Sequence, residues 1–163
     1  MWIEAAAAFE KSLAALPLTV YQAGETILAE GSRTDQLLIL RTGNVAVVKA
    51  GIEIARVSEP GAVFGEISAL LDCPHTAEVR ALASSQFHVV HPAALQDPAA
   101  LFYVATILAR RIDSANQALV ELTSEIHDKP PSVIDITIKK MQKLLGASGA
   151  HVPHAGYSYN PLA

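Results

Sequence analysis

Residues 64–71 of the chain read Phe-Gly-Glu-Ile-Ser-Ala-Leu-Leu, and residues 74–79 continue as Pro-His-Thr-Ala-Glu-Val. Gly65 and Glu66 lead into residues that favour a short helix, which we expect to last about one turn. Pro74 interrupts that helix, and the residues after it predict the start of a strand. This stretch is therefore expected to form a tight turn, a one-turn helix and a strand in succession.

The sequence on both sides of this stretch is divided into short apolar runs. Glycines at positions 24, 31, 43, 51, 61 and 65 punctuate the first part of the chain. The runs predict strands at residues 18–21, 26–29, 36–41, 45–49 and 52–57, and two more at 76–81 and 86–90. Short strands with turn signals at this spacing indicate an antiparallel sandwich or barrel.

Helices are predicted on both sides of this strand region. Residues 4–16 contain no Gly or Pro and predict a short helix that ends at Pro17. Residues 97–127 predict a long helix, and residues 132–145 predict a short one after the Pro130-Pro131 break. Residues 147–163 show no periodicity and are expected to form a loose tail. The predicted fold class is α+β.

Apolar residues in the long helix recur at alternating steps of four and three. They are Leu101, Ala105, Leu108, Ile112, Ala115, Leu119, Leu122 and Ile126. This heptad stripe is typical of a coiled-coil seam, and it predicts a homodimer through residues 97–127. The alternative is that the stripe covers the β-domain. The flanking Val104 and Ile107 could take that role, which would leave the stripe for a partner helix.

Composition excludes several classes of protein. The 163 residues, 51% apolar and 17% charged, provide one domain with a sizeable core and a short appendage. A formal net charge of −4 argues against nucleic acid or an anionic membrane as the main partner. No apolar run is long enough to span a bilayer, and the first residues lack the cationic start of a secretory signal. We therefore expect a cytoplasmic protein.

Signatures of catalysis, resident cofactors and DNA reading are missing from the sequence. A nucleophile elbow, a P-loop and a His-x-His metal pattern are absent, so we expect neither an enzyme nor a metal site or cofactor. Cys73 is the only cysteine, which excludes an internal disulfide and a site with several thiolates. One helix and a tail after the long helix are too little for a winged helix-turn-helix, so direct DNA binding is not expected.

The order of helix, short strands, turn stretch and long helix resembles the cyclic-nucleotide-binding domain of catabolite-activator-type proteins. The resemblance covers residues 18–127, and its landmarks are Ala23-Gly24-Glu25, Glu30-Gly31, Thr42-Gly43, Pro60-Gly61, Phe64-Gly65-Glu66 and Ala109-Arg110-Arg111-Ile112. It implies an antiparallel β-roll, a jelly-roll-like double-stranded β-helix, with an N-terminal helix and a long dimerisation helix over residues 1–128. Residues 129–163 would be an appendage with one short helix.

The resemblance also assigns roles in binding cAMP or cGMP. Backbone N–H groups near Gly65 and at Ala77 would hold phosphate oxygens, because a glycine without Cβ lets the main chain come close. Glu66 would accept the ribose 2′-hydroxyl proton, although a carboxylate there could instead satisfy backbone donors at the helix start. Thr76 would offer a hydroxyl. The implied binding residues are Phe64, Gly65, Glu66, Ile67, His75, Thr76, Ala77, Arg111 and Asn116.

His75 departs from the family pattern, which usually has arginine after the proline. Arginine supplies a permanent charge and a planar fork, whereas imidazole, with a pKa near ~6.5, is mostly neutral at cytoplasmic pH. Arg111 is the candidate to replace that charge, and Asn116 would contact the base or lie beside the dimer seam. Two functions stay open: a regulatory module that binds cAMP or cGMP and relays it through the dimer helix, or a degenerate dimeric interaction domain that binds neither.

Overall fold

The computed structural model describes residues 2–126 and 133–146 of the chain. The chain divides into two compact units, Met1–Ile107 and Leu108–Ala163. The predicted boundary between residues 128 and 129 lies outside the described residues and stays a prediction, as does the tail at 147–163.

The first unit contains two short helices before the strands and two helical segments after them. The N-terminal prediction of one helix over residues 4–16 corresponds to α1 (Trp2–Ser12) and a 3₁₀ turn, η1 (Leu13–Ala15). The strands are β1 (Leu18–Tyr21), β2 (Thr26–Leu28), β3 (Leu37–Thr42), β4 (Val45–Lys49), β5 (Ile52–Val57), β6 (Val63–Phe64), β7 (Glu78–Ala81) and β8 (Ser85–Val90). A one-turn helix, α2 (Glu66–Leu71), separates β6 from β7, and η2 (Pro92–Gln96) leads into α3 (Pro98–Ile126).

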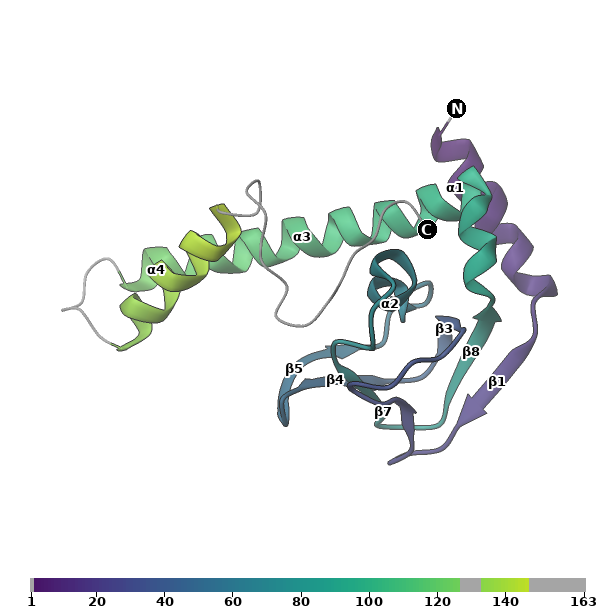
Figure 1. The fold of residues 1–163 in the computed structure, drawn as a ribbon, viewed down its shortest axis with the longest axis horizontal. Helices are drawn as coiled ribbons and strands as arrows, with labels where there is room; N and C mark the ends of the chain where they lie inside the picture. Colours follow the sequence, from purple (N-terminus) through teal and green to yellow (C-terminus); the bar gives the residue numbers. More distant parts are fainter. Residues whose placement is uncertain (1, 127–132, 147–163) are drawn as a thin grey trace. The chain divides into compact units, whose positions relative to one another are not determined.

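The strands form two antiparallel sheets (Figure 1), and the antiparallel arrangement is the one that the sequence predicts. One sheet has the order β1-β8-β3-β6 and the other β2-β7-β4-β5. Strands that are distant in sequence pair directly: Leu18 of β1 faces His88 of β8, and Ile39 of β3 faces the same His88 from the other side. The α+β roll of the sequence analysis is therefore confirmed, and its connections bring residues 18–42 against residues 63–90.

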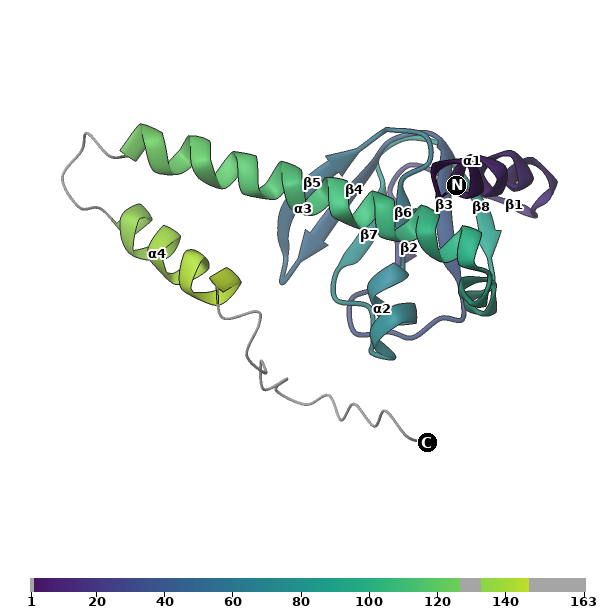
Figure 2. The same ribbon diagram turned by 90° about the horizontal axis from the view of Figure 1, so that it is seen from above.

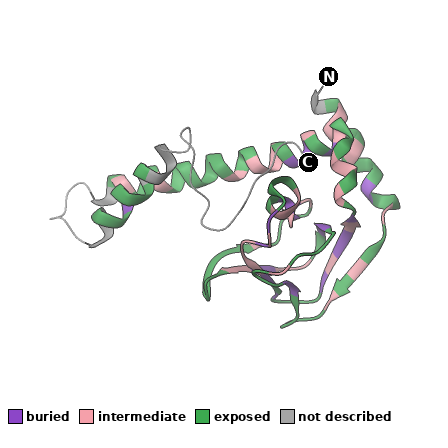
Figure 3. Cartoon of the chain, viewed as in Figure 1, coloured by how far each residue is buried: buried purple, intermediate pink, exposed green. Residues whose placement is uncertain are grey.

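The apolar core contains side chains from both sheets. Phe87 is fully buried, and its ring meets Phe64 edge-on at 6.0 Å and Tyr21 at 5.8 Å between ring centres. Figure 3 shows the buried residues concentrated on the strands. The buried cluster comprises Ile27, Leu28, Leu38, Leu40, Val45, Ala62, Phe64, Val79, Ala81 and Phe87. Burial of this many apolar side chains is the main stabilising term for such a domain.

The part of α3 that belongs to the first unit has one buried face and one exposed face. Tyr103 packs against Phe9 of α1, with ring centres 5.4 Å apart, and Figure 2 shows α1 beside the start of α3. Tyr103 and Val104 are 6% and 2% exposed, whereas Leu101 of the heptad stripe is 42% exposed. Val104, which flanks the stripe, therefore lies in the buried face of this part of the helix.

The second unit contains the rest of α3 and α4 (Val133–Gly146). Ile112 and Leu122 of the heptad stripe are 62% and 48% exposed, and Ile138 of α4 is buried. Exposed apolar residues at heptad spacing are what a dimer seam requires, but dimerisation itself stays a prediction. Within the described residues, no helix is long and apolar enough to cross a membrane.

Candidate functional site

Residues 64–79, named the cassette from here on, have as their second residue a glycine with no space for a larger side chain. Gly65 has φ of +83°, in the left-handed region, and it is the N-cap of α2. A Cβ added to Gly65 would lie 2.8 Å from the backbone O of Gln36 and 3.5 Å from Cε1 of His75. The main chain at Gly65 thus lies directly against the backbone of Gln36 and the His75 ring, because only a hydrogen occupies the place of a side chain.

The first turn of α2 places a carboxylate in the interior. Glu66 is 5% exposed and Phe64, the last residue of β6, is 4% exposed, whereas Ile67 is 39% exposed. The first backbone bond of the turn runs from Ala69 N–H to Gly65 O at 3.1 Å. In an α-helix the first N–H groups have no acceptor inside the helix, so another part of the chain or a ligand bonds them.

His75 is a buried, neutral histidine. It is 5% exposed, and its main chain exchanges hydrogen bonds with residues 31–32: His75 N–H donates to Ser32 O, and Gly31 N–H donates to His75 O, both at 2.8 Å. Its Nε2 lies 2.8 Å from Oγ1 of Thr34. Burial lowers the pKa of His75 below its ordinary value of 6.5, because desolvation disfavours the imidazolium. The position that carries a permanent charge in the family pattern is therefore uncharged near neutral pH.

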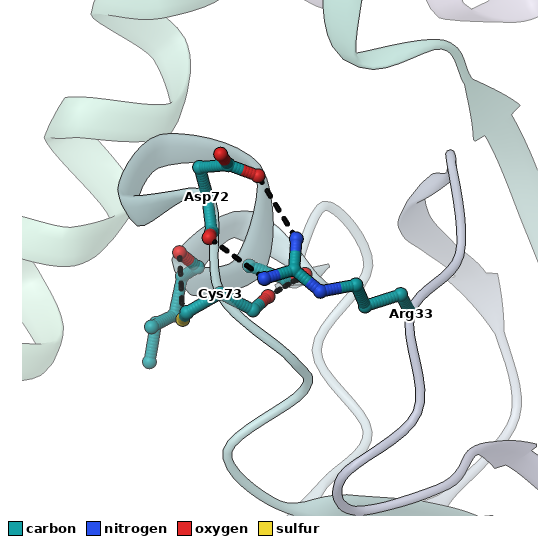
Figure 4. Close-up of polar contacts among 5 residues, drawn as sticks. Arg33, Asp72 and Cys73 are labelled. Atoms are coloured by element: carbon teal, nitrogen blue, oxygen red, sulfur yellow. Dashed lines mark hydrogen bonds and ion pairs between the residues drawn. The ribbon is translucent and has the colours of Figure 1, made fainter. Parts of the chain in front are cut away.

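The far end of α2 is tied to the loop before β3 (Figure 4). Arg33 Nη1 lies 2.9 Å from Oδ1 of Asp72, and Nη2 donates to the backbone O of Asp72 at 3.0 Å. Asp72 has φ of +47° and ends the helix. Ser68 Oγ donates to the backbone O of Cys73, which orders the turn that follows. Sequence reasoning missed Arg33 and Asp72, because 39 residues separate them and neither belongs to a motif.

The cassette ends just before β7. Thr76 and Ala77 are half-buried and precede Glu78, the first residue of the strand, so the strand starts two residues later than the sequence predicts. Arg80 Nε donates to Oε1 of Glu78 at 2.7 Å, and the Arg80 side chain is exposed. Arg80 therefore pairs with a residue of its own strand.

Seven of the predicted binding residues lie in the first unit, and among them the His75 ring lies beside Gly65. Arg111 and Asn116 lie on the part of α3 that belongs to the second unit, so their roles at the cassette stay predictions. In the described part of the chain, no group of three or more His, Cys, Asp or Glu side chains could hold a metal ion. The seven residues, all in the first unit, are Phe64, Gly65, Glu66, Ile67, His75, Thr76 and Ala77.

Comparison with known proteins gives a family and two kinds of relative. Residues 18–98 match the model of the family described as cyclic nucleotide-binding domain. The cGMP-dependent protein kinase egl-4 of Caenorhabditis briggsae is 31% identical over 75 residues, which make up 46% of this chain and 10% of the kinase. The chain thus spans a small part of the length of this curated relative.

Solved structures are similar over most of the chain. The cAMP-bound PfPKA-R is 27% identical with a TM-score of 0.54, over 66% of this chain and 37% of that one. The Catabolite Activator Protein of Thermus thermophilus is 18% identical with a TM-score of 0.56, over 86% of this chain and 83% of that one, which shows a shared fold. With the family match, these similarities show that residues 18–98 of the chain belong to the cyclic nucleotide-binding domain family.

Proposed function

We propose that this chain is a regulatory module that binds a cyclic nucleotide, cAMP or cGMP, at the cassette. The observation that carries the proposal is the backbone at Gly65, which is left-handed, has no room for a Cβ and is followed by the buried Glu66. A left-handed glycine keeps the N–H groups around it accessible to an anion, because no side chain covers them. The family match supports the same ligand class.

Different residues of the cassette would bind different parts of the nucleotide. Backbone N–H groups from Gly65 onward and at Ala77 would donate to the phosphate oxygens. Glu66 would accept the hydrogen bond of the ribose 2′-hydroxyl, and this charge-assisted bond would distinguish a cyclic nucleotide from a simple anion. Thr76 would donate its hydroxyl to the phosphate or to the base.

His75 makes the affinity lower than an arginine would. A charge-assisted phosphate contact contributes roughly 1.5–3 kcal/mol, which is about ten- to a hundredfold in affinity. The neutral ring of His75 does not supply this contact, since burial lowers its pKa. A bound phosphate would raise that pKa again and recover part of the loss. Arg111 would supply further positive charge from α3.

A relay through the long helix would complete the regulatory function. Ligand binding would favour one of two packings of α3 and thereby change the geometry of a homodimer. The exposed heptad residues, Ile112 and Leu122 among them, support α3 as the dimer seam. The module would act in the cytoplasm and would regulate a partner rather than catalyse a reaction.

One observation favours a second function, a dimeric interaction domain that binds no cyclic nucleotide. The His75 ring already has a partner in Thr34, at 2.8 Å, and it carries no charge near neutral pH. A cassette held together by this pair would keep the fold of the family without the strongest contact to a phosphate.

Calorimetric titration with cAMP and with cGMP separates the two functions. We expect the wild-type chain to bind one of them weakly, His75→Arg to bind about ten- to a hundredfold more tightly, and Glu66→Gln to lose most of the affinity. His91→Arg is the matched control, because it adds the same charge at an exposed histidine outside the cassette. Absence of wild-type binding at millimolar nucleotide, with binding gained only by His75→Arg, would establish the second function.

A further inference from the structure

A groove in the first unit lies apart from the cassette. It has a volume of about 310 Å³, and its lining residues all lie outside residues 64–79. Leu13 and Ala14 of η1 line it together with Leu18 of β1 and Leu40 of β3. This volume is at the lower end of the range for small-molecule sites, and such sites combine apolar walls with a few polar groups.

A buried histidine without a partner lines this groove. His88, in the middle of β8, is 9% exposed. Its Nδ1 is shielded from solvent and has no hydrogen-bond partner among the described residues. By contrast, His75 is buried to a similar degree, and its Nε2 forms a hydrogen bond with the Thr34 hydroxyl. Because buried polar atoms are nearly always paired, the unpaired Nδ1 sets His88 apart from the other residues that line the groove.

A cation lies in the same groove. Arg41, near the end of β3, lines it beside His88. Burial of the ring, and then the charge of Arg41, lowers the pKa of His88 below 6.5, so the imidazole is neutral. Arg33, Arg56 and Arg80 each bond a carboxylate, but the Arg41 guanidinium has no hydrogen bond or ion pair with any described residue. The groove is thus lined by one unpaired cation and one neutral imidazole.

We propose that this groove binds a small organic acid, with one carboxylate and an apolar body. The planar fork of Arg41 matches a carboxylate, and the ring of His88 supplies a further N–H donor. Leu13 and Leu18 would contact the apolar body. Glu10 also lines the groove and repels a second negative charge, so a monocarboxylate is preferred to a dicarboxylate.

The groove is connected to the start of α3. Gly61 lines it, and the backbone O of Gly61 accepts a hydrogen bond of 2.9 Å from the Tyr103 hydroxyl. On the α1 side, Phe9 packs on the ring of the same Tyr103. Elements on both sides of the groove therefore contact one residue of α3, Tyr103.

The test uses 3-phenylpropanoate, its neutral amide and the whole chain labelled with ¹⁵N-histidine. We expect the acid, at millimolar concentration, to shift the imidazole ¹⁵N signals of His88, and the amide to bind at least about tenfold more weakly. Arg41→Met should weaken binding of the acid about tenfold, whereas Arg56→Met, which removes an exposed arginine of β5 outside the groove, should leave it unchanged. Ala14→Phe, which fills the groove without altering its charge, should abolish binding.

Three results would overturn the proposal: unshifted His88 signals at millimolar acid, equal binding of acid and amide, or equal effects of Arg41→Met and Arg56→Met. The Ala14→Phe variant keeps the test decisive if Arg41→Met does not fold. Glu66→Gln should bind the acid like wild type, because Glu66 does not line the groove. Loss of nucleotide binding in that variant therefore tests the proposed function of the cassette and does not affect the test of the groove.

Discussion

Replacement of Gly65 by alanine should destabilise the first unit through two separate effects. The first effect comes from the backbone conformation. Gly65 has φ of +83°, and a residue with a Cβ in the left-handed region lowers the free energy of unfolding by about 1–2 kcal/mol. The second is steric, because the new Cβ would lie 2.8 Å from the backbone O of Gln36. An atom of the main chain cannot rotate away, so strain of about 1–3 kcal/mol should follow. The free energy of unfolding should fall by about 2–5 kcal/mol in total.

Gly24→Ala is the matched control. Gly24 has φ of +89°, and a Cβ added there would meet nothing within 4 Å. It should therefore lose only the backbone contribution of about 1–2 kcal/mol. Urea denaturation of both variants and of wild type is monitored by far-UV circular dichroism. A change in the midpoint at constant slope gives the difference in the free energy of unfolding.

Equal destabilisation by Gly65→Ala and Gly24→Ala would refute the reasoning, since it would mean that the main chain at Gly65 does not lie against Gln36. A loss for Gly65→Ala that exceeds the control by about 1–3 kcal/mol would support it. The same variant tests the cassette, because a main chain pushed away from Gln36 also moves the N–H groups proposed for the phosphate.

Three further predictions follow from burial and charge. The folded state lowers the pKa of His75 and of His88 below 6.5, so stability present above pH 6.5 should be lost as the pH falls towards the folded-state pKa values. The urea midpoint should be lower at about pH 5.5 than at about pH 7.5, on the two sides of the ordinary histidine pKa of about 6.5. His88→Leu should make this difference between the two midpoints smaller. Ile112→Glu places a charge on an exposed heptad position and should convert a dimer to monomer in sedimentation; an unchanged mass would refute the seam. Arg33→Ala should lower the free energy of unfolding by less than about 1 kcal/mol, since the side chains of Arg33 and Asp72 are 58% and 94% exposed; a larger loss would show that the pair orders the cassette.

Local patterns predicted most of the elements, and long-range contacts explain what they missed. The strand at residues 52–57 matches β5, and the one-turn helix after Gly65 matches α2. β6 was missed because it has only two residues, Val63 and Phe64, and two residues show no alternation. Its existence depends on pairing with Leu38 and Ile39 of β3, which the sequence around residue 63 does not encode.

The site was predictable where a motif carried it. Gly65 and Glu66 stand out as glycine and carboxylate before a helix, and the neutral state of His75 follows from its residue type and agrees with the effect of burial on its pKa. The contacts of His75 with Thr34 and of Arg33 with Asp72 join residues that are 41 and 39 positions apart in the sequence, so no local pattern predicts them. Sequence reasoning did not single out His88, because its burial and the unpaired state of its Nδ1 are properties of the packed sheet.

The position of β8 between β1 and β3 has a consequence for the synthesis of the chain. β8 ends at Val90, and β1 pairs with no strand but β8 within the described sheets. While the ribosome is still adding residues 43–84, β1 has no partner, and Leu37–Leu40 of β3 lacks the neighbour that shields it. Contacts between residues this far apart form late and slowly, and unpaired apolar strands associate with other chains in the meantime. A nascent chain stalled before Ser85 should therefore be the species that needs a chaperone.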